Sequence, residues 1–130
     1  MTKDWIGMAK DLRAGLREMR AGAPEVMKAF AGIAQAALEP KALDTKTKEL
    51  IALAISVAVR CDDCIAFHAK AAVDRGATRD EVLETLGMAI YMGAGPAAMY
   101  AAHALEAYQQ FADAKTGDGA TAAPQHSPTQ

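Results

Sequence analysis

The chain has 130 residues, a formal net charge of −2 and 52% hydrophobic residues. This length is typical of a single domain, and the apolar fraction is sufficient for a core and for contacts between subunits. Lys and Arg are scattered rather than clustered, so the charge pattern gives no general attraction to nucleic acid. We therefore expect one domain that binds neither DNA nor RNA.

The apolar segments are too short for a secretory signal or a membrane span. Residues 1–10 lack the uninterrupted apolar stretch of a signal peptide. The longest uncharged apolar run, Leu50 to Val59, has half of the roughly 20 residues that a membrane-spanning helix needs. The sequence predicts a soluble, cytoplasmic protein without a membrane partner.

Two helices are predicted in the N-terminal part of the chain. Apolar residues at steps of three and four indicate an amphipathic helix from about residue 3 to 20, and these residues are Trp5, Met8, Leu12, Leu16 and Met19. Pro24 lies near the first position of a second helix, where proline is favoured. Pro40 ends that helix.

The middle of the chain predicts two more helices joined near residue 60. Residues 48–60 contain neither Gly nor Pro and predict a buried helix, with Asp44 or Thr45 as its N-cap. Residues 65–75 form the next helix, and Gly76 suits the left-handed position that follows a helix end.

The C-terminal part predicts a helix, a bend and a last helix. The segment 78–81, Thr-Arg-Asp-Glu, has the pattern of a capping box at a helix start. Residues 93–96, Gly-Ala-Gly-Pro, break or bend the chain before a helix from about Pro96 to Ala112. The remainder is rich in Gly, Ala, Thr, Pro and Gln, which is typical of a disordered tail.

These elements predict an all-α bundle of about six helices in residues 1–113, followed by a disordered tail at 114–130. We find no strand pattern and no internal repeat. Several helices are apolar on more than one face, and a chain this short cannot bury all of those faces by itself. We therefore expect a homo-oligomer.

The only two cysteines, Cys61 and Cys64, lie at the start of the helix that contains His68. Cys64 and His68 are one turn apart and share a helix face. If this helix folds back antiparallel onto residues 48–60, Glu49 lies about three residues, or roughly 4.5 Å of helix rise, from His68. This spacing predicts a relay from Glu49 through His68 to Cys64.

The spacing of Glu49, Cys61, Cys64 and His68 resembles the motif of alkylhydroperoxidase D (AhpD) in the carboxymuconolactone decarboxylase-like superfamily. The similarity covers roughly residues 23–111. AhpD itself is longer, has a second, degenerate copy of the unit, and has His where this chain has Asp63. The resemblance implies an AhpD-like helical bundle, trimeric or hexameric assembly, and reduction of hydroperoxides with a lipoyl-bearing or thioredoxin-like dithiol donor.

The resemblance implies that Cys61, Cys64, His68 and Glu49 are catalytic. Only a thiolate attacks a peroxide oxygen, and a helix N-terminus favours that anion, whereas the two intervening aspartates oppose it. A base is therefore needed, and His68 oriented by Glu49 is placed to act as one. Contact with His68 favours Cys64 as the attacking thiol, although a CxxC pair at a helix start more often exposes its first cysteine.

Other functions of the cysteine pair remain open. A zinc site would need two further ligands, from His68 with His103 or Glu49, and no second cysteine pair is present. A c-type haem would need His where residue 65 is Ile. We expect neither a metal nor a cofactor. A decarboxylase-type lyase does not need a CxxC pair, and a non-catalytic redox-sensing oligomer would use its disulfide only to change shape.

Overall fold

The computed structural model describes residues 3–119, and all regular structure in that range is helical. The helices are α1 (Trp5–Gly22), α2 (Pro24–Leu38), α3 (Thr45–Ala58), α4 (Asp62–Asp74) and α5 (Arg79–Gly119). The predicted all-α class is confirmed. The predicted caps are also present, because Asp44 accepts a hydrogen bond from the Thr47 N–H at 2.7 Å and begins α3.

The helix α5 is bent at the predicted position. Ala94 has a left-handed backbone with φ 53° and ψ −135°, and it divides α5 into two helical halves. A Cβ added to Gly93 would lie 2.7 Å from the Cβ of Ala97, so this approach requires glycine. Counting both halves of α5, the described chain has the six helical segments that the sequence predicts.

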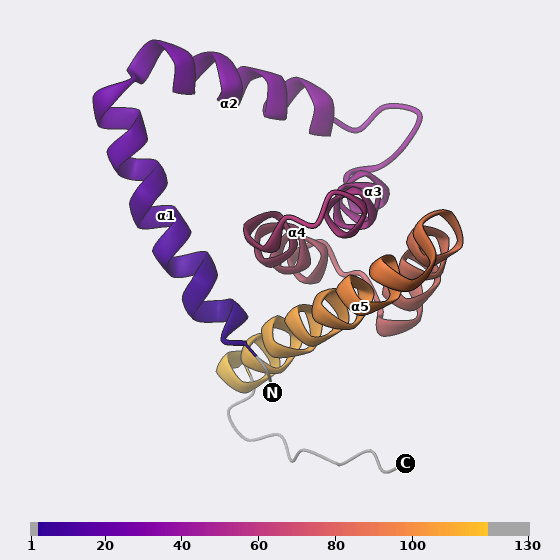
Figure 1. Ribbon diagram of the computed structural model, residues 1–130. Coiled ribbons are helices and arrows are strands. Elements are labelled where there is room, and N and C mark those ends of the chain that lie inside the picture. Colours follow the sequence, from indigo (N-terminus) through magenta and orange to yellow (C-terminus); the bar gives the residue numbers. More distant parts are fainter. Residues whose placement is uncertain (1–2, 120–130) are drawn as a thin grey trace.

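The core lies where α3, α4 and the two halves of α5 meet, as Figure 1 shows. Five large side chains in it are completely buried: Trp5, Leu53, Val57, Ile65 and Val82. Buried alanines from α4 and α5 belong to the same cluster. Small side chains allow helix backbones to approach closely, which explains the high alanine content of these two helices.

The first two helices form an outer arm. In Figure 1, α1 rises from beside the end of α5, and α2 runs back toward the start of α3. α1 contacts α4 and α5, whereas α2 contacts only α1 and α3. No residue of α2 is buried, and even its apolar side chains Val26, Phe30 and Ile33 are mostly exposed. The arm therefore leaves an apolar helix face uncovered within one chain.

The last helix is longer than the sequence predicts. α5 continues to Gly119, beyond the expected end near Ala112 and into the expected tail. In this added part, Lys115 Nζ donates to the Val73 carbonyl of α4 at 3.4 Å, and Thr116 Oγ1 donates to the Ala112 carbonyl at 3.0 Å. The rest of the expected tail, residues 120–130, lies outside the described residues.

Candidate functional site

A left-handed residue at the end of α3 brings Cys61 to the start of α4. Arg60 has φ 58° and donates its N–H to the Val57 carbonyl, while Cys61 donates its N–H to the Ser56 carbonyl. These two bonds form a Schellman motif, which usually has glycine at the left-handed position. The turn makes Cys61 the N-cap of α4.

The two cysteines form a disulfide across the first turn of α4. Their Cα atoms are 5.2 Å apart, and the Cys64 N–H donates to Cys61 Sγ at 3.2 Å. Both residues are half-buried. The amides of a helix N-terminus carry a partial positive charge, so this position favours a thiolate when the disulfide is reduced.

Glu49 and His68 meet across the antiparallel pair of α3 and α4. His68 Nδ1 lies 2.7 Å from Glu49 Oε1, and the Glu49 side chain is only 6% exposed. A carboxylate can only accept a hydrogen bond, so Nδ1 carries the hydrogen, and whenever the ring is neutral Nε2 has the free lone pair. The contact that the helix spacing predicts is present, with His68 one turn after Cys64 on α4.

A cavity of about 360 Å³ adjoins His68. α2, α3 and α4 form its walls, which consist of Ala34, Ala37, Leu38, Lys48, Ile51, Ala52, Ile55 and His68. Lys48 Nζ donates to the carbonyls of Ala37 and Glu39, so its charge is bound to the end of α2. The cavity is therefore apolar apart from the imidazole. The sequence pattern alone does not indicate this cavity, because it depends on how α2 packs on α3, although Ala34, Ala37 and Leu38 share one face of α2.

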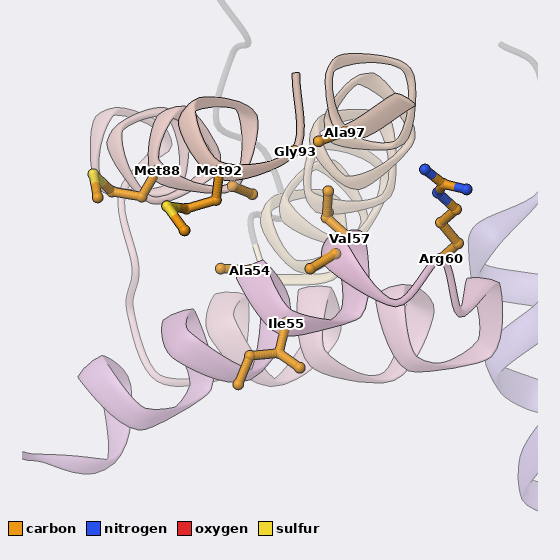
Figure 2. A pocket seen from close by; sticks show the side chains of 10 residues that line it. Ala54, Ile55, Val57, Arg60, Met88, Met92, Gly93 and Ala97 are labelled. Carbon is orange, nitrogen blue, oxygen red and sulfur yellow. The ribbon is translucent and has the colours of Figure 1, made fainter. Parts of the chain in front are cut away.

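A second apolar cavity, of about 380 Å³, lies between α3 and the bend of α5. Figure 2 shows Met88 and Met92 of α5 above Ile55 of α3, with Arg60 at the turn beyond. Neither cysteine, Glu49 nor His68 lines this cavity. Of these two cavities, the one between α2 and α3 is thus the one that reaches the candidate site.

The geometry gives the zinc alternative no support. Within residues 3–119, no group of three or more His, Cys, Asp or Glu side chains is arranged to hold a metal ion. His103 instead packs its ring against Trp5 and Tyr100, with ring centroids 5.8 and 5.5 Å away.

Within residues 3–119, no helix is both long and apolar enough to cross a membrane.

Comparison with known proteins places these residues in a family. The sequence profile of the Carboxymuconolactone decarboxylase family matches residues 24–107, which include all four candidate residues. An uncharacterized protein of Cupriavidus necator is 43% identical over 105 residues, covering 75% of this chain and 93% of the relative. An uncharacterized protein of Haemophilus influenzae is 41% identical over 108 residues, covering 83% and 96%.

Two solved structures have the same fold. A carboxymuconolactone decarboxylase family protein from Legionella pneumophila, in its apo form, is 52% identical with a TM-score of 0.82, covering 83% of this chain and 96% of the other. A Thermotoga maritima protein of that family, with a suggested involvement in an antioxidative response, is 28% identical with a TM-score of 0.76, covering 88% and 98%. With its AhpD-like arrangement of helices and cysteines, this chain belongs to the carboxymuconolactone decarboxylase family.

Proposed function

We propose that the protein is a thiol-dependent peroxidase that reduces hydroperoxides through a Cys61–Cys64 dithiol and disulfide cycle. The observation that supports this most directly is the 2.7 Å contact between Glu49 and His68, one helical turn from a disulfide at a helix N-terminus. A buried carboxylate that fixes an imidazole beside a thiol is the usual arrangement for activating a nucleophile.

The first step oxidises Cys64. His68 Nε2 accepts the thiol proton, and the thiolate sulfur attacks the distal oxygen of the hydroperoxide. The O–O bond breaks, the alcohol leaves with the proton returned by His68, and Cys64 becomes a sulfenic acid. Glu49 holds the imidazole in the required tautomer and stabilises its charged form.

The second step forms the disulfide, and the third restores the dithiol. The Cys61 sulfur attacks the sulfenic sulfur, the S–O bond breaks and water leaves. An external dithiol, lipoyl-bearing or thioredoxin-like, then supplies two electrons and two protons by thiol–disulfide exchange. Cys61 suits its part because its sulfur already accepts a hydrogen bond from the helix N-terminus.

Dithiol chemistry fits this chain better than the lyase reaction in the family's name. A cofactor-free decarboxylation has no use for two cysteines in disulfide contact, whereas a redox cycle requires them. The suggested antioxidative involvement of the Thermotoga maritima relative agrees with this choice. A redox sensor would also use the disulfide, but it would consume only about one equivalent of oxidant.

Turnover distinguishes these functions. With excess hydroperoxide and a dithiol donor, the protein should reduce many equivalents, and loss of both thiols should follow one equivalent when no donor is present. Cys64→Ser should abolish turnover, while Cys61→Ser should leave a sulfenic acid that dimedone traps. Consumption of a single equivalent would indicate a sensor, and the reverse pattern in the two variants would exchange the roles of the cysteines.

The relay predicts that removing either His68 or the Glu49 carboxylate slows peroxide reduction. His68→Ala and Glu49→Gln should each slow peroxide reduction by roughly 10²- to 10⁴-fold at neutral pH, which is the usual contribution of a positioned base. The His68→Ala variant should recover much of the lost rate at higher pH, where the thiol ionises unaided. Stopped-flow oxidation of the reduced protein measures both effects. An unchanged rate in Glu49→Gln would remove Glu49 from the mechanism.

The cavity beside His68 favours hydroperoxides with an apolar organic group. Its walls are aliphatic apart from the His68 imidazole and Lys48, and the Lys48 ammonium group is bound to the end of α2. A bound apolar group would displace water and leave its peroxide oxygens at the polar end, toward His68. Hydrogen peroxide has no group to fill this space.

Narrowing the cavity should therefore act on one substrate class only. Ala34→Leu should lower kcat/KM for cumene hydroperoxide by roughly tenfold and leave hydrogen peroxide reduction unchanged. Ala36→Leu, on the same helix but outside the cavity lining, is the matched control. Steady-state kinetics with both peroxides measures the ratio, and equal losses for both substrates would show that the cavity does not select the substrate.

The uncovered apolar surface supports assembly into a homo-oligomer, and the AhpD resemblance implies a trimer or a hexamer. Tyr91 and Met92 on α5 are each 78% exposed, and Phe30 and Ile33 on α2 are 59% and 67% exposed. Apolar patches of this kind on one chain usually mark an interface. The alanine-rich faces of α5 would allow helices of neighbouring subunits to approach closely.

Light scattering at low micromolar concentration should give a mass of three or six times 13.6 kDa. Tyr91→Glu should shift the mass toward smaller species because it places a charge among the exposed apolar side chains of α5, which include Met88 and Met92. Gln109→Glu, on a polar exposed position of the same helix, is the control and should leave the mass unchanged. A monomer mass for the unmodified protein would contradict the assembly.

A further inference from the structure

The start of the chain is fastened onto the second half of α5. Trp5 is completely buried, its Nε1 donates to Glu106 Oε1 at 2.8 Å, and its backbone N–H donates to Gln110 Oε1 at 2.8 Å. Gln110 Nε2 in turn donates to the Lys3 carbonyl at 2.7 Å. Residues 3–5 therefore have a fixed backbone before α1 has completed its first turn.

From this fixed segment, Lys3 reaches the aspartate that follows Cys61. Its Nζ lies 2.5 Å from Asp62 Oδ2 and 5.6 Å from the centroid of the Trp5 ring. The hydrogen bond to Asp62 raises the pKa of Lys3, so the ammonium group is charged at neutral pH. Both side chains are partly exposed, and such a pair forms reliably only when its backbone is already ordered.

Asp62 is the negative charge nearest in sequence to the first cysteine. A free carboxylate there would oppose ionisation of the Cys61 thiol and would work against the helix N-terminus. The other charged or titratable groups around the pair are Arg60 on the preceding turn, Asp63 and His68 on α4, Glu49 on α3, and Tyr100, His103 and Glu106 on α5. Of these surroundings, Lys3 is the cation in direct contact with Asp62.

We propose that Lys3 is a positioning residue for the redox pair, which neutralises Asp62 and so keeps the Cys61 thiol easy to ionise. The inference rests on the dithiol cycle proposed above, in which Cys61 must attack the sulfenic sulfur of Cys64. This role of Lys3 does not depend on which hydroperoxide is the substrate. The N-terminal segment acts on the site from a position 58 residues before Cys61 in sequence, through a single ion pair.

The thiol pKa tests this directly. In the reduced full-length protein, the rate of Cys61 alkylation by iodoacetamide is followed against pH, with the modified cysteine located by peptide mass spectrometry. Lys3→Gln should raise the apparent pKa of Cys61 by about half to one unit, which slows alkylation at neutral pH by about three- to tenfold. Lys3→Arg keeps the positive charge, so its alkylation rate should depend on pH as in the unmodified protein.

Two further variants separate charge from structure. Lys70→Gln removes another lysine that pairs with an aspartate of α4, Asp74 at the far end of the helix, and should leave the profile unchanged. Asp62→Asn removes the charge that Lys3 neutralises, so it should leave the Cys61 pKa close to that of the unmodified protein, and Lys3→Gln should have little effect in that background. Lys3→Gln leaves the backbone carbonyl of residue 3 and the Trp5 side chain in place, so the hydrogen bonds that attach this segment to α5 remain.

A Lys3→Gln profile that matches the unmodified protein would overturn the proposal. So would a full shift in the Asp62→Asn background, because Lys3 would then act by another route. Alkylation uses neither hydroperoxide nor donor, so its result is independent of turnover. A protein that shows the predicted pKa shifts but no peroxidase activity would refute the proposed peroxidase and retain this role of Lys3.

Discussion

The left-handed turn at Arg60 determines the geometry of the whole candidate site. It reverses the chain so that α4 lies antiparallel to α3, makes Cys61 the N-cap of α4, and sets the register in which Glu49 faces His68. An arginine in this conformation costs more than glycine would, so the helix packing must hold it there. Leu53, Val57 and Ile65, all completely buried on the two helices, supply that packing.

The site combines a buried carboxylate with a half-exposed sulfur pair, and each needs a different environment. Glu49 is buried on the same face of α3 as Leu53 and Val57, where an unpaired charge would be costly, and His68 compensates it. The cysteines lie half-buried at the start of α4, where the amide dipoles of the helix N-terminus stabilise anions. One short helix, α4, connects the two environments within its first two turns.

The sequence predicted most of this arrangement because its main determinants are local. The Thr78 and Glu81 capping box forms as expected, with bonds of 2.9 and 3.1 Å, and the Glu49–His68 contact follows from helix rise and a single turn. What it did not predict depends on contacts between distant segments. The cavity needs α2 placed against α3, the extended end of α5 contacts the Val73 carbonyl, and Lys3 meets Asp62 only because Trp5 is buried against α5.

The arm of α1 and α2 links the candidate site to the rest of the surface. One face of α2 lines the cavity at His68 through Ala34 and Leu38, while Phe30 and Ile33 on the same helix are exposed. Within one chain, α2 is fixed by α1, by α3 and by the bonds from Lys48 to its last carbonyls. Few contacts hold it, so whatever covers its outer face also sets how firmly the cavity wall is held. A neighbouring subunit at that face would thereby stabilise the site without contributing a side chain to it.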